Sequence, residues 1–355
     1  MLAAALLASV STLSNAALFL VTKYADDGSP GTLRWAIGQN NANPNPAGNT
    51  IQILTVGAPP YVIKLNSLLP SIIGPALVQG MQKGLPTAGP SIAIDGSNFI
   101  NGDDQSSCPG TVSGFGPNSR SVFGPGLAVV DSGNVRITNL EIRQFCIGIL
   151  SLRSHDNRFD HNTIHNTSGA AAILITGDAG DPAGSSTAGL SVNNLIDSNL
   201  VYQTGDGFEC TRGTANTTYR NNVLYELRDR PNVPYSQGIE CAGTADRIYI
   251  IDNTFTGYSD GLQLNAATNT VVSGNTISGS TFGITWSGSG VAIGNTSPAV
   301  AWVSARPAPQ ARSRSPRTAF TTTVMPTSFR RRVPPAERPT PPVRRSWAST
   351  SARMA

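Results

Sequence analysis

The sequence predicts an all-β fold, a right-handed parallel β-helix with a short N-terminal capping helix. The first observation is a short pattern that recurs between residues 135 and 296, with copies starting at Ile137, Phe159, Ile196, Tyr219, Ile250 and Val272. The second is a column of asparagines at the fourth position of the pattern: Asn162, Asn199, Asn222, Asn253 and Asn275. The shortest interval between them is 22 residues, which suits one coil of a solenoid built from stacked short strands.

The third observation is a second short strand after each copy, starting at Gly148, Ala172, Gly207, Gly238, Gly261 and Gly283. Successive coils should stack at ~4.8 Å, the spacing of parallel strands. The branched and aromatic residues at both ends of each pattern would then point inward, and the asparagine amides would bond to one another as a ladder. Leucine-rich and helical repeats fit less well, because the region is rich in Asn, Thr, Gly and Ser, which disfavour helix. Parallel crossovers are generally right-handed.

Composition and charge fit an extracellular repeat protein. Only 13% of the 355 residues are charged, and 36 are glycine. The formal net charge is +4, but eleven of the 25 basic residues and one of the 21 acidic residues lie after residue 300. The first 300 residues therefore hold 14 bases and 20 acids. A mildly acidic solenoid has no basic surface for phosphate backbones, so we do not expect nucleic acid as a partner.

Three segments are expected along the chain. Residues 1–16 resemble a secretory signal, with an apolar run that ends at small residues. Residues 17–299 form the β-helix, and residues 300–355 are an Arg/Pro-rich tail that we expect to be disordered. The composition of the tail also fits a frameshifted end. Outside the signal no apolar run reaches the ~18 residues of a membrane span, so we expect a secreted or cell-surface monomer.

The N-terminal segment predicts the cap of the solenoid. Thr32 is placed to cap a short amphipathic helix over Leu33–Gln39, which would cover the open first coil. The stretch Val21–Ile53, with DGSPGTLRWAI at its centre, resembles the N-terminal segment of secreted bacterial right-handed parallel β-helix proteins of the pectin-lyase-like superfamily. The resemblance covers about residues 20–296. It implies a fold and no single activity, because the superfamily contains lyases, hydrolases, epimerases and non-enzymatic surface proteins.

Aligned second strands predict a pair of stacked carboxylates. In GFEC and GIEC, the apolar residue points inward, so Glu209 and Glu240 point outward on neighbouring coils, ~5 Å apart. Asp206 and Asp260 precede glycines of the same column. The long loops 177–189 and 226–236 would wall a groove over this column. They would bring Arg228 and Arg230 close, with Arg212 following the strand.

Four interpretations of this cluster remain open. Asp206, Glu209, Glu240 and Asp260 could hold Ca²⁺ through carboxylate oxygens. A cation with Arg228 or Arg230 suits a uronic-acid polysaccharide lyase, in which a base removes a proton beside the sugar carboxylate. Two carboxylates ~5 Å apart also suit a retaining glycosidase. The fourth interpretation is a solvated stack whose repulsion is screened by water.

Other side chains offer weaker signals. Tyr202 and Tyr225 align three places after the ladder asparagine, where rings either contact sugars or cover the neighbouring coil. We interpret His155, His161 and His165 as surface hydrogen-bonding residues. The four cysteines allow three pairings. Two of them, Cys210 and Cys241, align on adjacent coils as a thiol stack or a disulfide, and Cys108 with Cys146 is a plausible second pair.

The leading hypothesis is a secreted β-helix protein that binds an acidic or neutral polysaccharide or a cell-surface glycan. In the catalytic version, Glu209, Glu240, Arg228 and Arg230 cleave the glycan, and Arg212, Tyr202 and Tyr225 bind it. The alternative is a non-catalytic, adhesin-like surface protein, which the generic repeats also fit. The sequence does not decide between these two classes, and it names neither the sugar nor the linkage.

Overall fold

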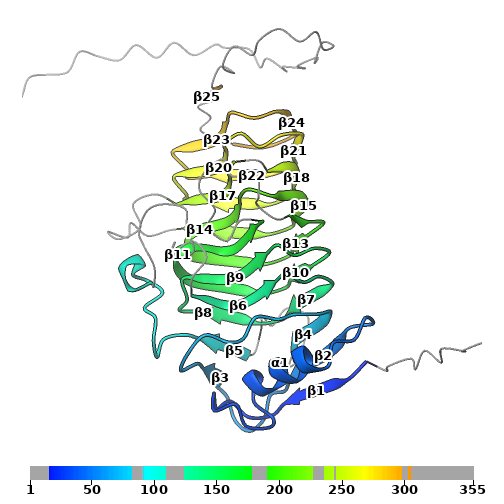
Figure 1. Ribbon diagram of the computed structural model, residues 1–355. Helices are drawn as coiled ribbons and strands as arrows, with labels where there is room; N and C mark the ends of the chain where they lie inside the picture. The colour runs from blue at the N-terminus through cyan, green and yellow to red at the C-terminus, as the bar shows by residue number, and fades with distance from the viewer. Residues whose placement is uncertain are drawn as a thin grey trace, which may run out of the picture. The chain divides into compact units, whose positions relative to one another are not determined.

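The chain folds as a right-handed parallel β-helix, as predicted. The computed structural model describes residues 16–81, 90, 92–108, 124–177, 190–226, 236–243, 245–297 and 303–304. Its strands pair in parallel, each with the equivalent strand of the next coil (Figure 1). Pairing divides them into three walls, which we name A, B and C in the order in which a coil passes through them.

Wall A is one sheet whose strands follow the solenoid from its first coil to its last described one. Its strands are β1 (Leu18–Val21), β2 (Asn49–Ile53), β4 (Ala76–Gly80), β7 (Val135–Thr138), β10 (Arg158–Asp160), β12 (Ser191–Val192), β13 (Leu195–Asp197), β15 (Thr214–Arg220), β18 (Asp246–Ile251), β21 (Thr270–Ser273) and β24 (Gly290–Ile293).

Walls B and C belong to a second sheet, because two long strands, β11 (Thr163–Thr176) and β14 (Leu200–Cys210), pass through both. Wall B contains their first halves with β3 (Tyr61–Lys64), β5 (Ile92–Asp95), β8 (Glu141–Arg143), β16 (Val223–Tyr225), β19 (Thr254–Thr256) and β22 (Thr276–Ser278). Wall C contains their second halves with β6 (Pro125–Val130), β9 (Ile147–Leu152), β17 (Gln237–Cys241), β20 (Asp260–Leu264), β23 (Phe282–Trp286) and β25 (Val303–Ser304).

The predicted inward residues form the core. Both ends of each repeat pattern are buried, and Phe159, Ile164, Tyr219 and Leu224 are 0% exposed. The predicted ladder is confirmed as well. The Asn222 amide nitrogen donates to Asn253 Oδ1 at 2.9 Å, and Asn222 Oδ1 accepts from the Asn199 amide at 3.0 Å. Because each buried amide is paired with its neighbours above and below, the ladder fixes the vertical register of the coils.

Left-handed backbone turns the corners of the coils. The residue before each ladder position has a positive φ, for example 55° at Asn221 and 55° at Asp252. A second such column lies at the beginning of wall A and includes Asn216 of β15, with a φ of 49°. Asn, Asp and Gly tolerate this conformation better than other residues, which explains their abundance in the sequence. Asn216 is exposed, but its backbone makes a substitution there more costly than exposure alone suggests.

A helix covers the first coil, as predicted. Helix α1 (Leu33–Ala42) begins after the N-cap Thr32, whose hydroxyl accepts from the Trp35 backbone nitrogen at 3.3 Å. It ends three residues later than the sequence suggested. The extra turn contains Asn40, which is 0% exposed and accepts a hydrogen bond from the Asn49 amide. A 3₁₀ turn, η1 (Gln105–Ser107), lies between β5 and β6, in the described part of residues 96–124, which we name the first long loop.

Two disulfides decide the cysteine pairing that the sequence left open. Cys108 pairs with Cys146 and Cys210 with Cys241, with Cα–Cα distances of 5.6 and 4.5 Å. Of the predicted tail, the description reaches only β25. Within the described residues no helix has the length and apolar character needed to cross a bilayer.

Candidate active site

The predicted carboxylate pair lies on wall C. Glu209 of β14 and Glu240 of β17 are direct register partners. Phe208 and Ile239 beside them are 0% exposed and fill the core, so the two glutamates point out of the wall and are half-buried. The next residue in the column is Gln263, the register partner of Glu240.

Glycines make this approach of the strands possible. A Cβ on Gly207 would lie 2.3 Å from Cδ2 of Leu224 and 2.4 Å from the Gly238 oxygen. A Cβ on Gly238 would lie 2.4 Å from the Gly261 oxygen. Any larger residue would therefore force the corner between walls B and C apart. The glycines recognised in GFEC and GIEC are needed to bring the following glutamates into register.

Two aspartates extend the cluster: Asp206, three residues before Glu209 on β14, and Asp260, the first residue of β20. Asp206 Oδ1 accepts from the Gln237 backbone nitrogen at 2.8 Å, and Gln237 is in turn the register partner of Asp260. Asp260 Oδ1 accepts from the Thr285 hydroxyl at 3.4 Å. Asp206 and Asp260 are therefore two coils apart, on either side of Glu240.

All four carboxyl groups have raised pKa values. Burial, and next the charge of Glu240, raise the pKa of Glu209 to about 8. Burial, Glu240 and Glu209 hold the pKa of Asp206 well above its usual range. Burial and Asp260 raise that of Glu240, and burial raises that of Asp260. Each of the four therefore holds a proton more tightly than an ordinary carboxyl group does, and the pKa of about 8 favours the protonated form of Glu209 at neutral pH.

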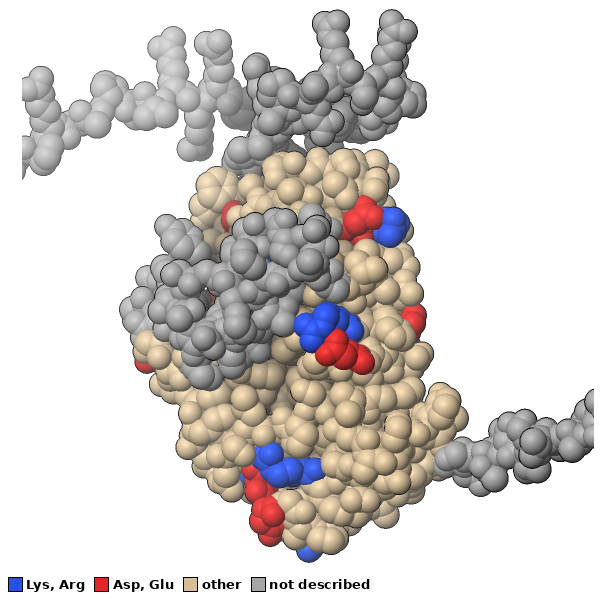
Figure 2. Space-filling view, viewed as in Figure 1, with Lys and Arg blue, Asp and Glu red and all other residues tan. Residues whose placement is uncertain are grey.

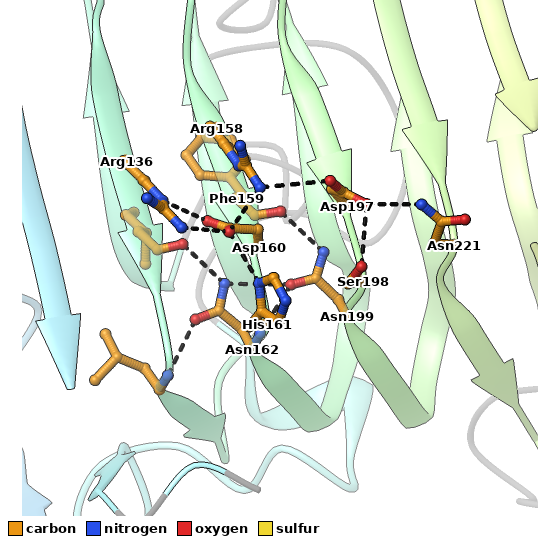
Figure 3. A network of polar contacts seen from close by, with 12 residues as sticks. Arg136, Arg158, Phe159, Asp160, His161, Asn162, Asp197, Ser198, Asn199 and Asn221 are labelled. Atoms are coloured by element: carbon orange, nitrogen blue, oxygen red, sulfur yellow. Dashed lines mark hydrogen bonds and ion pairs between the residues drawn. The ribbon is translucent and has the colours of Figure 1, made fainter. Parts of the chain in front are cut away.

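A second column of carboxylates on wall A behaves in the opposite way (Figure 3). Asp160 forms a two-point ion pair with Arg136 at 2.9 and 2.7 Å and lies 3.1 Å from Arg158. Asp197 contacts Arg220 at 3.0 Å. Burial alone would raise the pKa of Asp160, but the bonds from Arg136 and His161 and the arginine charges outweigh it, so the net pKa is lowered. These acids are ionised structural groups.

The predicted tyrosines lie on wall B, around a corner from the glutamates. Tyr202 stacks on Tyr225 with ring centroids 5.1 Å apart and on His165 with centroids 4.5 Å apart. Both faces of Tyr202 are thus covered by other rings, and only its edge remains for a ligand. His165 holds the same offset from Asn162 that Tyr202 holds from Asn199, so the third ring of the stack can be recognised in the sequence.

Sequence reasoning also missed the ionic cluster that ends this stack. Arg143 lies 2.9 Å from Asp95 and also pairs with Glu141, and His165 Nε2 lies 3.2 Å from Glu141. The His165 bond and Arg143 outweigh burial, which by itself would raise the pKa, and hold the pKa of Glu141 below its usual range. The register partners Asp95 and Arg143 are 48 residues apart, so only the coil stacking brings them together.

Of the three arginines predicted near the glutamates, only Arg212 lies in the described part of the chain. Arg212 is 8% exposed, and its aliphatic stem packs over Gly243, where a Cβ would lie 2.7 Å from Cγ. Arg228 and Arg230 lie outside the described residues. A cationic partner for the acids on wall C therefore stays a prediction.

The side chains that bind soft metal ions, those of Cys, Met and His, are few in the described ranges or already form other bonds. All four cysteines form disulfides, and Met81 is the one methionine within the described ranges. His155 bonds to Asp156 at 2.7 Å, and His161 to Asp160 at 2.9 Å, as expected for surface histidines. In the part of the chain that the structure describes, no three His, Cys, Asp or Glu side chains are grouped to hold a metal ion. Copper prefers thiolate, thioether and imidazole ligands, and these residues do not fit a copper centre.

Comparison with known proteins adds one curated relative and several solved structures. A 3-dehydroshikimate dehydratase of Acinetobacter baylyi is 39% identical over 251 residues, which cover 70% of this chain and 50% of the relative. The chain thus spans about half the length of that protein.

Two solved structures illustrate the structural likeness. An alginate lyase from Paenibacillus matches at 15% identity and a TM-score of 0.42, over 76% of this chain and 94% of the other. A surface adhesin of Streptococcus pneumoniae matches at 12% identity and 0.36, over 80% and 91%. These values are too low to transfer a residue's role.

Residues 105–295 match the family model described as periplasmic copper-binding protein (NosD). The match contains the repeat pattern, the asparagine ladder and the four acids of wall C. The described side chains do not provide a set of ligands that fits copper, so we derive no chemistry from the copper named in that description. Because the matched span is more than half of the 355 residues, the chain belongs to the NosD family.

Proposed function

We propose that this protein is an exported acid–base enzyme that cleaves carbon–oxygen bonds in hydroxyl-rich ring substrates, such as the sugar units of a polysaccharide. The observation that carries the proposal is the register pairing of Glu209 with Glu240, two half-buried carboxyls with raised pKa values. Pairs of acids whose environments shift their pKa values are typical of catalytic sites. Two disulfides and the periplasmic description of the family support export.

The two glutamates fit the two roles of an elimination. Glu209, which carries a proton at neutral pH, would donate it to the departing oxygen. The carboxylate of Glu240 would take the proton from the carbon next to a carbonyl or carboxyl group, and the electron pair of that C–H bond would form the new double bond. Hydrolysis needs the same pair, with Glu209 as the acid and Glu240 directing water or attacking the sugar carbon.

The relative favours elimination over hydrolysis. A dehydratase, by its name, removes water, and a polysaccharide lyase removes an alcohol in the same manner. Both reactions break a C–O bond after loss of a neighbouring proton. The relative is twice as long as the part matched here, so its substrate is a candidate to test and not an assignment.

The proposal also includes a positive charge at the site, supplied by an arginine or by Ca²⁺. Four carboxyls repel an acidic sugar, so a uronate substrate would need Arg228, Arg230 or Ca²⁺ to neutralise it. Calcium would have to draw Asp206, Glu209, Glu240 and Asp260 closer together, since no three described acids converge on one point. Calorimetric titration with Ca²⁺ tests this arrangement, and a Glu240→Gln variant that binds Ca²⁺ as tightly as the wild type would contradict it.

On wall B, we expect a sugar to contact Tyr225 more than Tyr202. Tyr202 lies between two rings, whereas Tyr225 is followed in its column by the small residues Thr256 and Ser278. A sugar ring could continue the stack on the outer face of Tyr225, with hydroxyl groups beneath it. Tyr225→Ala should therefore weaken glycan binding more than Tyr202→Ala.

A substrate panel tests the function. Acidic and neutral polysaccharides and hydroxylated ring acids, 3-dehydroshikimate included, are incubated with the protein. Ultraviolet absorbance detects unsaturated products, and a reducing-end assay detects hydrolysis. We expect an unsaturated product that Glu209→Gln abolishes and that Gln263→Ala, one coil further in the same column, leaves unchanged. If no substrate reacts, and Glu209→Gln binds glycans like the wild type, the protein belongs to the non-catalytic, adhesin-like class.

A further inference from the structure

The disulfide Cys210–Cys241 lies directly behind the two glutamates. Each cysteine follows a glutamate in sequence, and the pairs Glu209–Glu240 and Cys210–Cys241 are consecutive steps of one register. Both cysteines are 0% exposed, with Cα atoms 4.5 Å apart. The covalent link therefore ties the same two strands that carry the carboxyl pair, one residue away.

The link closes one coil of the solenoid into a ring. Cys210 and Cys241 are 31 residues apart, and the chain between them passes through β15 on wall A and β16 on wall B before returning to wall C. The asparagine ladder holds the coils together at the corner between walls A and B. At the acid column the disulfide supplies a further, covalent constraint.

Like charges on adjacent strands supply a reason for such a constraint. Whenever both glutamates ionise, they repel each other across a half-buried surface, where water screens charge poorly. Asp206, on the strand of Glu209, and Asp260, on the strand that follows that of Glu240, add to the repulsion. Backbone hydrogen bonds alone would let this edge of the coil relax outward, and the carboxyls would then titrate independently.

We propose that the Cys210–Cys241 disulfide is a positioning element, which holds Glu209 and Glu240 at the spacing of adjacent strands so that they share one proton. The catalytic consequence rests on the proposed function, but proton sharing does not, because it can be measured without a substrate. The raised pKa of Glu209 depends in part on Glu240 and so reports on their separation.

The protein offers a matched control in its second disulfide. Cys108–Cys146 joins the first long loop to the start of β9, two coils before the strand that carries Glu209. Removing this disulfide takes one cross-link from the chain and leaves the strands of the acid pair, β14 and β17, unchanged. The double variants Cys210→Ala/Cys241→Ala and Cys108→Ala/Cys146→Ala therefore separate positioning from general stabilisation.

The decisive measurement is a ¹³C NMR titration of the glutamate side chains in full-length protein, with circular dichroism to verify folding. We expect the Glu209 midpoint near pH 8 in the wild type and in the Cys108/Cys146 variant. In the Cys210/Cys241 variant it should fall by about one pH unit or more, and the pH profile of turnover should shift with it. Adding Glu240→Gln to that variant should cause little further change, because the pair is already separated.

An unchanged Glu209 midpoint in a folded Cys210→Ala/Cys241→Ala variant would overturn the proposal. If the alanine pair does not fold, Cys210→Val/Cys241→Val fills more of the buried space and is titrated instead. If neither pair folds, the disulfide is a folding requirement and the positioning role is rejected. A shifted midpoint in a protein that acts on no substrate would support positioning while rejecting the enzyme, so the two failures are distinguishable.

Discussion

Walls A and C of this solenoid each carry a column of carboxylates, and the two columns differ in their counter-charges. On wall A, Asp160 and Asp197 are also direct register partners, but Arg136, Arg158 and Arg220 form ion pairs with them, and their pKa values are lowered. On wall C, Glu209 and Glu240 stack on each other, and their pKa values are raised. One repeat thus stabilises ionised acids on one face and accumulates proton-binding acids on another.

The comparison teaches where to look for chemistry in a repeat fold. Surface charges are few, and in the view of Figure 2 basic and acidic patches mostly lie next to each other. Paired charges of this kind are explained by stability. A column of acids without adjacent basic residues raises the free energy of the ionised protein. Such an unfavourable arrangement is typical of a functional site.

The largest expected difference between the two acid columns is the effect of substitutions on the rate of turnover. Glu240→Gln removes the proposed base and should lower kcat by a factor of about 10²–10⁴, the usual contribution of a positioned acid or base. Asp197→Asn on wall A should leave kcat per folded molecule within about twofold. Initial rates on the substrate found in the panel measure both. Equal losses would place the chemistry elsewhere.

For folding stability we expect the opposite: substituting an acid on wall A should lower the free energy of unfolding more than substituting one on wall C. Asp160 is 0% exposed and paired with Arg136, so Asp160→Ala leaves arginines without their partner. Because the arginines left behind are 45% and 39% exposed, the loss should be about 1.5–3 kcal/mol, the usual contribution of hydrogen bonds to a charged group. Asp206→Asn keeps an oxygen that can accept from the Gln237 backbone nitrogen and removes a charge that burial disfavours, so it should cost under about 1 kcal/mol. Urea denaturation at pH 7 compares the two, and similar losses would contradict the electrostatic distinction.

The pH dependence of stability should also separate the walls. The folded pKa of Glu209 lies above its unfolded value, so its contribution is fully present below about pH 4.5 and is lost as the pH rises through about 8. The wild type should therefore lose stability between pH 5 and 9. Glu209→Gln should be more stable than the wild type by roughly 2–4 kcal/mol at pH 9 and equal to it at pH 4.

Wall A gives the opposite sign. The folded pKa of Asp160 is depressed, so its contribution is present above the unfolded value, about 3.9, and is lost as the pH falls through the folded pKa. Asp160→Asn should therefore reduce the loss of stability below pH 4. Thermal unfolding across pH 3–9 tests both signs, and a Glu209→Gln curve parallel to the wild type would refute the raised pKa.

The asparagine ladder provides the smallest test, since both columns depend on the register it sets. Asn222→Leu removes the bonds to Asn199 and Asn253 and should cost ~1–3 kcal/mol, felt mainly in the coils around residues 196–255. The control is Asn216→Gly, because Gly accepts the φ of 49° at this exposed corner. Hydrogen exchange locates the loss, and equal protection in both variants would contradict a ladder that stabilises the register.

The sequence by itself determined the fold, the ladder and the stacking of Glu209 on Glu240. These features depend on two short-range regularities: the alternation of side chains along a strand and the recurrence of the pattern from coil to coil. The helix start at Thr32 was also readable, because a cap is a local interaction. Gly207 and Gly238 could be seen in the pattern, although the clash that makes them necessary could not.

Tertiary structure alone decided which acids are paired and which are not. Asp160 meets Arg136, 24 residues earlier, and Arg143 meets Asp95, 48 residues earlier, because insertions of different length separate neighbours in sequence but not in space. The same holds for the rings that cover both faces of Tyr202 and for the pairing of Cys108 with Cys146. The pKa of a carboxyl depends on the charges and burial around it, and in a solenoid half of these surroundings come from other coils.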